Sequence, residues 1–243
     1  MFRIKICGVT NVADALSAAR AGADAIGLNF YTGSARMVSP DHAAEIAAAL
    51  PAGTAKVGVF VNSTLDEIKA IVARLSLDLV QLHGDEPPEF VARLGELPVL
   101  RAFRPGNDGL LPISSYLAEC RRLAATPRMV LLDAHCHGAY GGSGQTLDWR
   151  LAADYRQLDA PPLVLAGGLD ASNVARAIET VRPDAVDVAS GVESVCPRKD
   201  PAKVAAFVAA ARTAFGAQGQ EAGGRGRRQS GQSAIRNPQS AIK

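Results

Sequence analysis

The chain has 243 residues and a formal net charge of +2, so its overall charge gives no general attraction to nucleic acid or to an anionic membrane surface. Apolar residues make up 48% of the chain, which suffices for one large core built mainly from Ala, Val, Leu and Ile. No apolar run approaches the roughly 20 residues of a membrane span. The first residues lack the apolar stretch of a signal peptide, and the cysteines show no CxxC spacing. We therefore expect a cytoplasmic protein with free thiols.

Short apolar runs alternate with segments of helical periodicity from residue 3 to residue 215. The runs predict strands at 3–7, 25–30, 56–61, 79–83, 99–103, 129–133, 163–166 and 185–189. The intervening segments predict helices at 12–21, 41–50, 65–75, 88–94, 113–125, 149–158, 172–181 and 201–215. Strict alternation predicts a parallel sheet, and eight units of this size favour a single (β/α)₈ TIM barrel. The alternative is an open doubly wound sheet, but no GxGxxG follows the first strand.

The last part of the chain differs in composition from the rest. Residues 216–243 are dominated by Gly, Gln, Ser and Arg, a composition that cannot bury enough apolar surface to fold. We expect a barrel domain at 1–215 and a disordered tail at 216–243. An RNA-binding arm is the alternative, although this segment has a single Gly-Arg-Gly and no aromatic residue for base stacking.

Two reactive side chains fall at predicted strand ends. Cys7 closes the first strand and precedes Gly8, and Asp133 closes the sixth. In a barrel the carboxyl ends of all strands open on one face, where active sites are built. A thiol with an ordinary pKa near ~8.5 needs a cationic setting to act as a base, and Lys5 and Arg36 are the nearest candidates. The alternative is that Cys7 is a small buried apolar residue.

Glycine-rich loops follow the sixth, seventh and eighth strands. Glycine lets an anion approach closely and exposes backbone N–H groups to it. Barrel enzymes often bind phosphate with the loops after strands seven and eight. Tight turns alone would also require glycines, but three such loops on neighbouring strands favour a phosphate site. Its predicted residues are Gly142, Ser143, Gly144, Gly167, Gly168, Ser190 and Gly191.

A metal site is the alternative use of the loop after the sixth strand. His135, Cys136 and His137 follow Asp133 closely. Three consecutive residues do not easily face one ion, and no HExxH pattern supports them. We expect no metal and no cofactor.

Short segments match, in order, the motifs of a known enzyme family. The matches are Lys5-Ile6-Cys7-Gly8, Gly27-Leu28-Asn29-Phe30-Tyr31, Ser34, Arg36 to Pro40, Val57-Gly58-Val59-Phe60, Gln81-Leu82-His83-Gly84-Asp85-Glu86, Leu131-Leu132-Asp133, Gly141-Gly142-Ser143-Gly144, Leu147-Asp148-Trp149, Leu165-Ala166-Gly167-Gly168-Leu169 and Ser190-Gly191-Val192-Glu193. Together they resemble phosphoribosylanthranilate isomerase. Where that family usually has Ser-Pro-Arg-Tyr, this chain has Ser34-Ala35-Arg36-Met37, which leaves the arginine in place but changes its loop.

The resemblance implies a (β/α)₈ isomerase of tryptophan biosynthesis that needs no metal or cofactor. It carries out an Amadori rearrangement of a phosphosugar by acid–base catalysis. Asp133 would be the general acid and Cys7 the general base. Arg36 would bind the anthranilate carboxylate, and the glycine loops would hold the 5-phosphate. We expect a monomer or homodimer without nucleic-acid or membrane partners.

Two other functions are compatible with a phosphate-binding barrel. A relative of indole-glycerol-phosphate synthase would need a catalytic lysine at a strand end, but Lys56 opens the third strand instead. A phosphate-ligand sensor without enzymatic activity would not need both an acid and a base in the mouth of the barrel.

Overall fold

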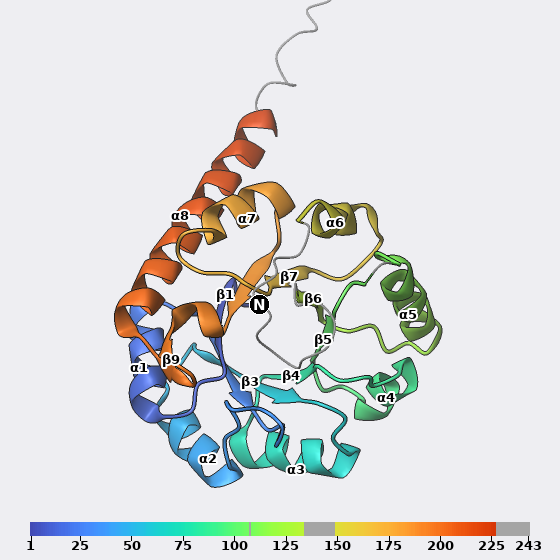
Figure 1. Ribbon diagram of the computed structural model, residues 1–243. Coiled ribbons are helices and arrows are strands. Elements are labelled where there is room, and N and C mark those ends of the chain that lie inside the picture. The colour runs from blue at the N-terminus through green and yellow to red at the C-terminus, as the bar shows by residue number, and fades with distance from the viewer. Residues whose placement is uncertain (107, 134–148, 227–243) are drawn as a thin grey trace, which may run out of the picture.

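Eight parallel strands close into a barrel in sequence order (Figure 1). The computed structural model describes residues 1–106, 108–133 and 149–226, with side chains of the last helix described to residue 218. The predicted (β/α)₈ fold is confirmed. The strands are β1 (Ile4–Cys7), β2 (Ala25–Asn29), β3 (Ala55–Phe60), β4 (Leu79–Leu82), β5 (Val99–Phe103), β6 (Met129–Asp133), β7 (Leu163–Ala166) and β8 (Ala185–Val188).

The helices form an outer ring around the strands (Figure 1). They are α1 (Val12–Ala21), α2 (Pro40–Ala49), α3 (Leu65–Leu75), α4 (Pro88–Leu94), α5 (Leu111–Arg122), α6 (Trp149–Asp154), α7 (Val174–Val181) and α8 (Pro201–Gly226). Local capping explains several of their starts: Thr64 and Glu67 form a capping box on α3, and Asn11 and Ser39 cap α1 and α2. None of the described helices is long and apolar enough to cross a membrane.

The structure differs from the predicted elements mainly after β8 and at the end of α8. An antiparallel hairpin, β9 (Glu193–Val195) and β10 (Arg198–Lys199), precedes α8 and was not predicted. The predicted helix end at residue 215 is wrong, because α8 continues through Gly226 and its last turns project beyond the barrel (Figure 1). Extending an existing helix avoids the nucleation cost of a new one. Residues 227–243 lie outside the described residues, so the division into a barrel at 1–215 and a tail at 216–243 stays a prediction.

The barrel interior changes character along its axis. At the amino-terminal end it is filled by apolar side chains that belong to one cluster, including Phe2, Ala25, Leu79, Met129 and Ala185. Toward the carboxyl end the inward positions become polar, with Lys5 and Gln81 fully buried. Two further apolar clusters lie between the sheet and the helices. The apolar half stabilises the fold, and the polar half is left for chemistry.

Residues up to Gln218 in α8 should suffice for stability. Phe207 is fully buried, and Phe215 and Gln218 still contact the barrel, Gln218 through a 2.7 Å hydrogen bond from Nε2 to the Ile178 carbonyl oxygen. We expect Phe207→Ala to lower the free energy of unfolding by ~3–5 kcal/mol. A chain ending at Gln218 should instead keep its melting temperature. Thermal unfolding of both variants checks this; a large fall on truncation would show that residues 219–243 contact the barrel.

Candidate active site

A cavity of about 520 Å³ opens at the carboxyl ends of the strands. It is lined by the two predicted reactive residues, Cys7 and Asp133, together with Arg36. The predicted residues after β7 and β8 line it as well: Gly167, Gly168, Ser190 and Gly191. The fold thus brings these predicted residues together. Gly142, Ser143 and Gly144, like His135, Cys136 and His137, lie outside the described residues.

Two glycines make room for Cys7 and its neighbours. Gly27 on β2 lies directly opposite Cys7 in the ladder, and a Cβ there would come within 2.8 Å of the Cys7 Sγ atom and 3.1 Å of Lys5 Nζ. Gly8 has φ +68, and a Cβ there would lie 2.4 Å from Cδ of Arg36. Because Gly8 has no side chain, the aliphatic part of Arg36 can pack against it. Because Gly27 has none, the Lys5 ammonium can lie close to the Cys7 thiol. This explains physically why Gly8 follows Cys7.

Lys5 projects to the same side of β1 as Cys7, as strand alternation requires. Its Nζ atom makes a 2.9 Å ion pair with Oδ1 of Asp187 inside the barrel. Burial alone would lower the pKa of Lys5, but Asp187 and Cys7 outweigh it and raise the pKa. Sequence reasoning pointed to Lys5 as a cation near Cys7 but missed Asp187. A carboxylate in the middle of the apolar run Ala185–Val188 is the signal that could have found it.

The pKa of the Cys7 thiol is raised above that of an ordinary thiol. Burial is the main cause, and the nearby Asp187 carboxylate adds to it. Lys5 and Lys199 act in the opposite direction but do not outweigh them. The expectation that Lys5 and Arg36 provide a cationic setting for Cys7 holds only in that Lys5 lowers the pKa of the thiol; burial and Asp187 outweigh it, so the pKa is raised rather than lowered.

Arg36 is engaged within the protein by Glu193. Its Nε and Nη2 atoms donate to the two carboxylate oxygens at 2.7 and 2.8 Å, a bidentate pair. Glu193 also accepts from Lys199 Nζ at 2.8 Å, and Lys199 donates to the Ala189 carbonyl oxygen. Burial alone would raise the pKa of Glu193, but these hydrogen bonds lower it. Arg36 thus holds its place in the cavity through a buried carboxylate.

The hairpin β9–β10 supplies both Glu193 and Lys199. It is anchored on α1, because Asp14 accepts a 3.0 Å hydrogen bond from the Lys199 backbone N–H. The two helices of the ring that flank this hairpin, α1 and α8, also pack on each other. Its strands are only two and three residues long, so no periodicity in the sequence could reveal them.

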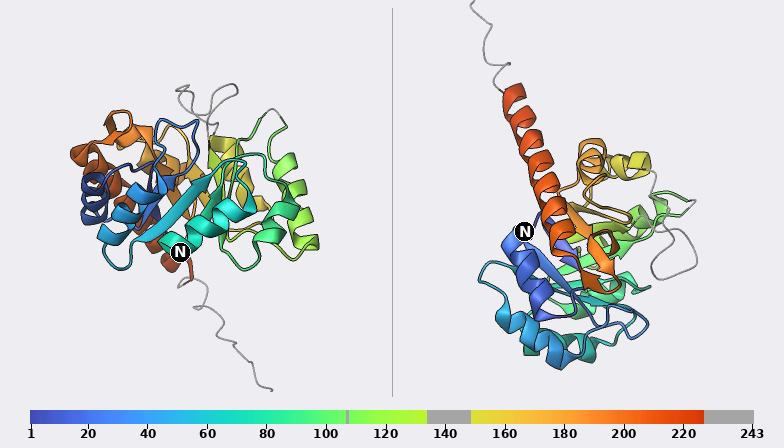
Figure 2. Two further views of the ribbon diagram at one scale, coloured as in Figure 1. Left: turned by 90° about the horizontal axis from the view of Figure 1, so that it is seen from below. Right: turned by 60° about the vertical axis from the view of Figure 1, so that its left-hand side comes forward.

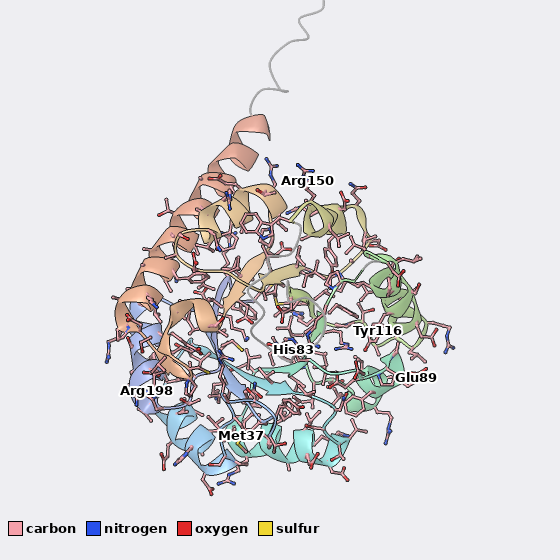
Figure 3. The ribbon with its side chains drawn as sticks, in the orientation of Figure 1. Met37, His83, Glu89, Tyr116, Arg150 and Arg198 are labelled. Carbon is pink, nitrogen blue, oxygen red and sulfur yellow. The ribbon has the colours of Figure 1, made fainter. Side chains whose placement is uncertain are left out.

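Asp133 is accompanied by His83, which follows β4. Nε2 of His83 lies 3.3 Å from Oδ2 of Asp133, and Nδ1 lies 2.9 Å from Nε2 of Gln81. The contact at Nδ1 orients the ring so that Nε2 faces the Asp133 carboxylate. Figure 3 shows His83 near the barrel axis. Gln81, His83 and Asp133 thus form one polar row at the mouth of the barrel.

The loops after β7 and β8 pack backbone against backbone. A Cβ on Gly191 would lie 1.9 Å from the Leu169 carbonyl oxygen, so no other residue fits there without movement of the chain. Gly167 and Gly168 have φ values of +87 and +64, the left-handed region that favours glycine. This close packing keeps backbone groups of both loops at the cavity wall, as an anion site requires.

A second, larger cavity lies at the amino-terminal end of the strands. It has a volume of about 960 Å³ and is lined by Met1, Arg3, Arg212 and Phe215, among others, with the N-terminus beside it (Figure 2). None of the predicted site residues that the structure describes lines it. Within the described ranges, no group of three or more His, Cys, Asp and Glu side chains is arranged to hold a metal ion.

The raised pKa of Cys7 gives a direct prediction. A raised pKa means that the thiolate appears at higher pH than in an ordinary thiol, so its ultraviolet absorbance should develop with a midpoint above 9.0. The difference spectrum between the wild-type protein and Cys7→Ser isolates this thiol from the others. A midpoint below 9.0 would mean that Lys5 and Lys199 outweigh burial.

Comparisons with known proteins agree with this geometry. Residues 4–210 match the family model of N-(5'phosphoribosyl)anthranilate (PRA) isomerase. The N-(5'-phosphoribosyl)anthranilate isomerase of Geobacter metallireducens is 47% identical over 213 residues, which is 87% of this chain and 100% of that protein. The one from Pseudomonas paraeruginosa is 46% identical over 213 residues, 87% of this chain and 95% of that protein.

Solved structures give the same assignment. Phosphoribosyl anthranilate isomerase from Thermotoga maritima superposes with a TM-score of 0.78 at 39% identity, covering 88% of this chain and 100% of that one. A second structure, in complex with reduced 1-(o-carboxyphenylamino)-1-deoxyribulose 5-phosphate, has a TM-score of 0.75 at 38% identity, with 88% and 100% coverage. The matched segment contains the whole cavity lining around Cys7 and Asp133. The chain belongs to the N-(5'-phosphoribosyl)anthranilate isomerase family.

Proposed function

We propose that this protein isomerises N-(5-phosphoribosyl)anthranilate to 1-(2-carboxyphenylamino)-1-deoxyribulose 5-phosphate in tryptophan biosynthesis, with Asp133 as general acid and Cys7 as general base. One observation carries this proposal. A thiol from β1 and a carboxyl group from β6 line one cavity whose wall also includes the glycine loops after β7 and β8. An Amadori rearrangement needs an acid, a base and an anchor for the phosphate in one place.

The first step opens the ribose ring. A proton passes from the Asp133 carboxyl group to the ring oxygen while the bond between that oxygen and C1′ breaks. The anilino nitrogen supplies its lone pair to form the C=N bond of a protonated Schiff base. Asp133 lines the cavity, and His83 contacts its Oδ2 atom, which fixes the orientation of the carboxyl group.

The second step removes the proton from C2′. The Cys7 thiolate takes it, and the electron pair of the C–H bond forms the C1′=C2′ bond of an enolamine while the nitrogen becomes neutral. The enolamine then tautomerises to the aminoketose, so the reaction conserves all atoms. Because the pKa of Cys7 is raised, the thiolate is a minor form in the free protein at neutral pH but a strong base once formed.

Substrate binding would use the remaining polar groups of the cavity. The loops at Gly167, Gly168, Ser190 and Gly191 are suited to the 5-phosphate by their backbone N–H groups, together with the predicted contribution of Gly142, Ser143 and Gly144. Arg36 provides positive charge for the anthranilate carboxylate. Both groups occur in the ligand bound to the related crystal structure, which carries a phosphate and a carboxyphenyl group.

The cellular setting follows from the same assignment. We infer that the enzyme works in the cytoplasm, where the thiols of Cys7, Cys120 and Cys196 stay reduced. We expect a monomer or homodimer, with a phosphosugar as substrate and no metal, cofactor, nucleic-acid or membrane partner. Residues 216–243 are proposed to be dispensable for catalysis, because the cavity is built from earlier residues.

The activity has a simple test. Phosphoribosylanthranilate is fluorescent, so the purified protein should remove its fluorescence in the absence of added metal or cofactor. Persistence of the fluorescence with folded protein would reject the proposed reaction.

The acid and the base should each be required for turnover. We expect Cys7→Ser and Asp133→Asn to lower the single-turnover rate by at least ~10², the usual contribution of one general acid or base. Binding of the reduced product analogue should survive in both variants, since the glycine loops are unchanged. Single-turnover kinetics are the right measurement, because product release can mask chemistry in kcat. A wild-type rate in Cys7→Ser would remove the thiolate from the mechanism and point to His83 as the proton acceptor.

Arg36 should act on binding more than on chemistry. Arg36→Ala is expected to raise KM by ~10-fold or more through the lost charge on the anthranilate carboxylate, with a smaller change in kcat. Arg36→Lys should recover part of the affinity, because an ammonium keeps the charge but not the planar fork. Steady-state kinetics of both variants test this; KM values equal to that of the wild type would exclude Arg36 from substrate binding.

A further inference from the structure

Lys5 is a fully buried cation with no place in the acid–base pair. Its side chain has 0% exposure and lies inside the barrel rather than at the solvent edge. It is among the largest fully buried side chains of the protein. Placing an ammonium there carries a desolvation penalty that anionic groups must compensate. A buried charge of this kind calls for a reason beyond packing.

The compensation comes first from Asp187. Lys5 and Asp187 are direct Cα partners in the ladder between β1 and β8, and the ion pair is 2.9 Å long. The register of the barrel therefore fixes the ammonium without depending on flexible loops. Asp187 is itself only 6% exposed.

The same ammonium lies beside the thiol of Cys7. Both Nζ of Lys5 and Sγ of Cys7 lie within 3.1 Å of one point above Gly27, where any other residue would place its Cβ. The two atoms are thus within the roughly 6 Å over which an opposite charge stabilises an ionised group. The effect is reciprocal: Lys5 lowers the pKa of Cys7, and Cys7 raises that of Lys5.

The other charges near Cys7 are paired with one another. Among the described residues the set around the thiol comprises Lys5 on β1, Asp187 on β8, Arg36 after β2, Glu193 on β9 and Lys199 on β10. Asp133, His83 and Arg104 line the same cavity from β6, from the end of β4 and from the loop after β5. The set of five carries three positive and two negative charges. A thiolate on Cys7 brings the set to electrical neutrality.

We propose that Lys5, held in register by Asp187, is the positioning residue that stabilises the Cys7 thiolate before that thiolate takes the C2′ proton. The inference rests on the proposed role of Cys7 as the base. Asp187 has two effects in this arrangement. It keeps the ammonium charged and in place, and it competes with the thiolate for that ammonium.

This competition predicts opposite effects for the two partners. Asp187→Asn keeps the shape of the side chain but leaves Lys5 with Cys7 as its nearest anion, so the thiolate should form at lower pH. Lys5→Met removes the cation and leaves the Asp187 carboxylate, so the thiolate should form at higher pH. If Lys5 and Asp187 only supported the fold, the two substitutions would not shift the pKa of Cys7 in opposite directions.

The test is the ultraviolet titration of the Cys7 thiolate, with each variant compared with the same variant carrying Cys7→Ser. We expect the midpoint to fall by about one pH unit or more in Asp187→Asn and to rise by a similar amount in Lys5→Met, the scale of a nearby charge. At pH 7 the single-turnover rate of Lys5→Met should fall at least tenfold with it. Lys56→Met, the same substitution on β3, which is separated from β1 by β2, is the matched control and should leave the Cys7 midpoint unchanged.

If Lys5→Met does not fold, Asp187→Asn alone tests the inference, because the midpoint of its Cys7 titration is expected to move down, toward neutral pH. Circular dichroism and thermal melting establish which variants are folded. An unchanged or raised midpoint in folded Asp187→Asn would overturn the inference, as would an unchanged midpoint in folded Lys5→Met.

The outcomes separate this inference from the proposed function. If Cys7→Ser keeps wild-type single-turnover rates, the base is misassigned, whatever the titrations show. If Cys7→Ser is inactive but the Cys7 midpoint is the same in Lys5→Met and Asp187→Asn as in the wild type, Cys7 remains the base and the role of Lys5 is rejected.

Discussion

The ion pair between Lys5 and Asp187 lies across the seam where the barrel closes. β1 and β8 are the first and last strands of the sheet, and their register places the two residues directly opposite each other. Closure thus has a chemical consequence as well as a topological one, because it determines which charges surround Cys7. A one-residue slip of β8 would turn Asp187 to the outside of the barrel and leave the buried ammonium without this carboxylate.

The interior of the barrel divides between stability and chemistry. One cluster of apolar side chains, contributed by Phe2 and by strands β2 to β8, fills its amino-terminal half. The carboxyl half holds Lys5, Gln81 and Asp187, whose polar groups require partners. Burying the charges of Lys5 and Asp187 costs desolvation free energy, which their ion pair offsets because the surrounding strands hold the two residues opposite each other. In agreement with this division, the larger cavity, at the amino-terminal end, is lined by none of the predicted site residues within the described ranges.

Sequence periodicity sufficed for the barrel and for the location of the site. Eight apolar runs were enough to place Cys7 and Asp133 at strand ends, because parallel strands all point their carboxyl ends to one face. What periodicity could not supply were contacts between residues distant in sequence. The pairing of Arg36 with Glu193, 157 positions away, depends on a hairpin too short to leave a pattern. The extension of α8 past residue 215 was missed because the prediction there rested on composition, which indicates that residues 216–243 bury little apolar surface. An existing helix can continue through such residues, because each added residue only extends a helix that is already nucleated.

The bidentate pair of Arg36 with Glu193 occupies one edge of the guanidinium, the edge formed by Nε and Nη2. Glu193 is covalently tethered there, so a carboxylate that binds through the same two atoms would have to displace it, whereas one that binds through Nη1 would not. Lys199 can keep Glu193 paired during such an exchange, because it already donates to Oε1. Such an exchange would replace one carboxylate by another, with little net change in charge or hydrogen bonding at Arg36. A ligand that binds at this edge would therefore gain little affinity from Arg36 and would depend on its other contacts in the cavity.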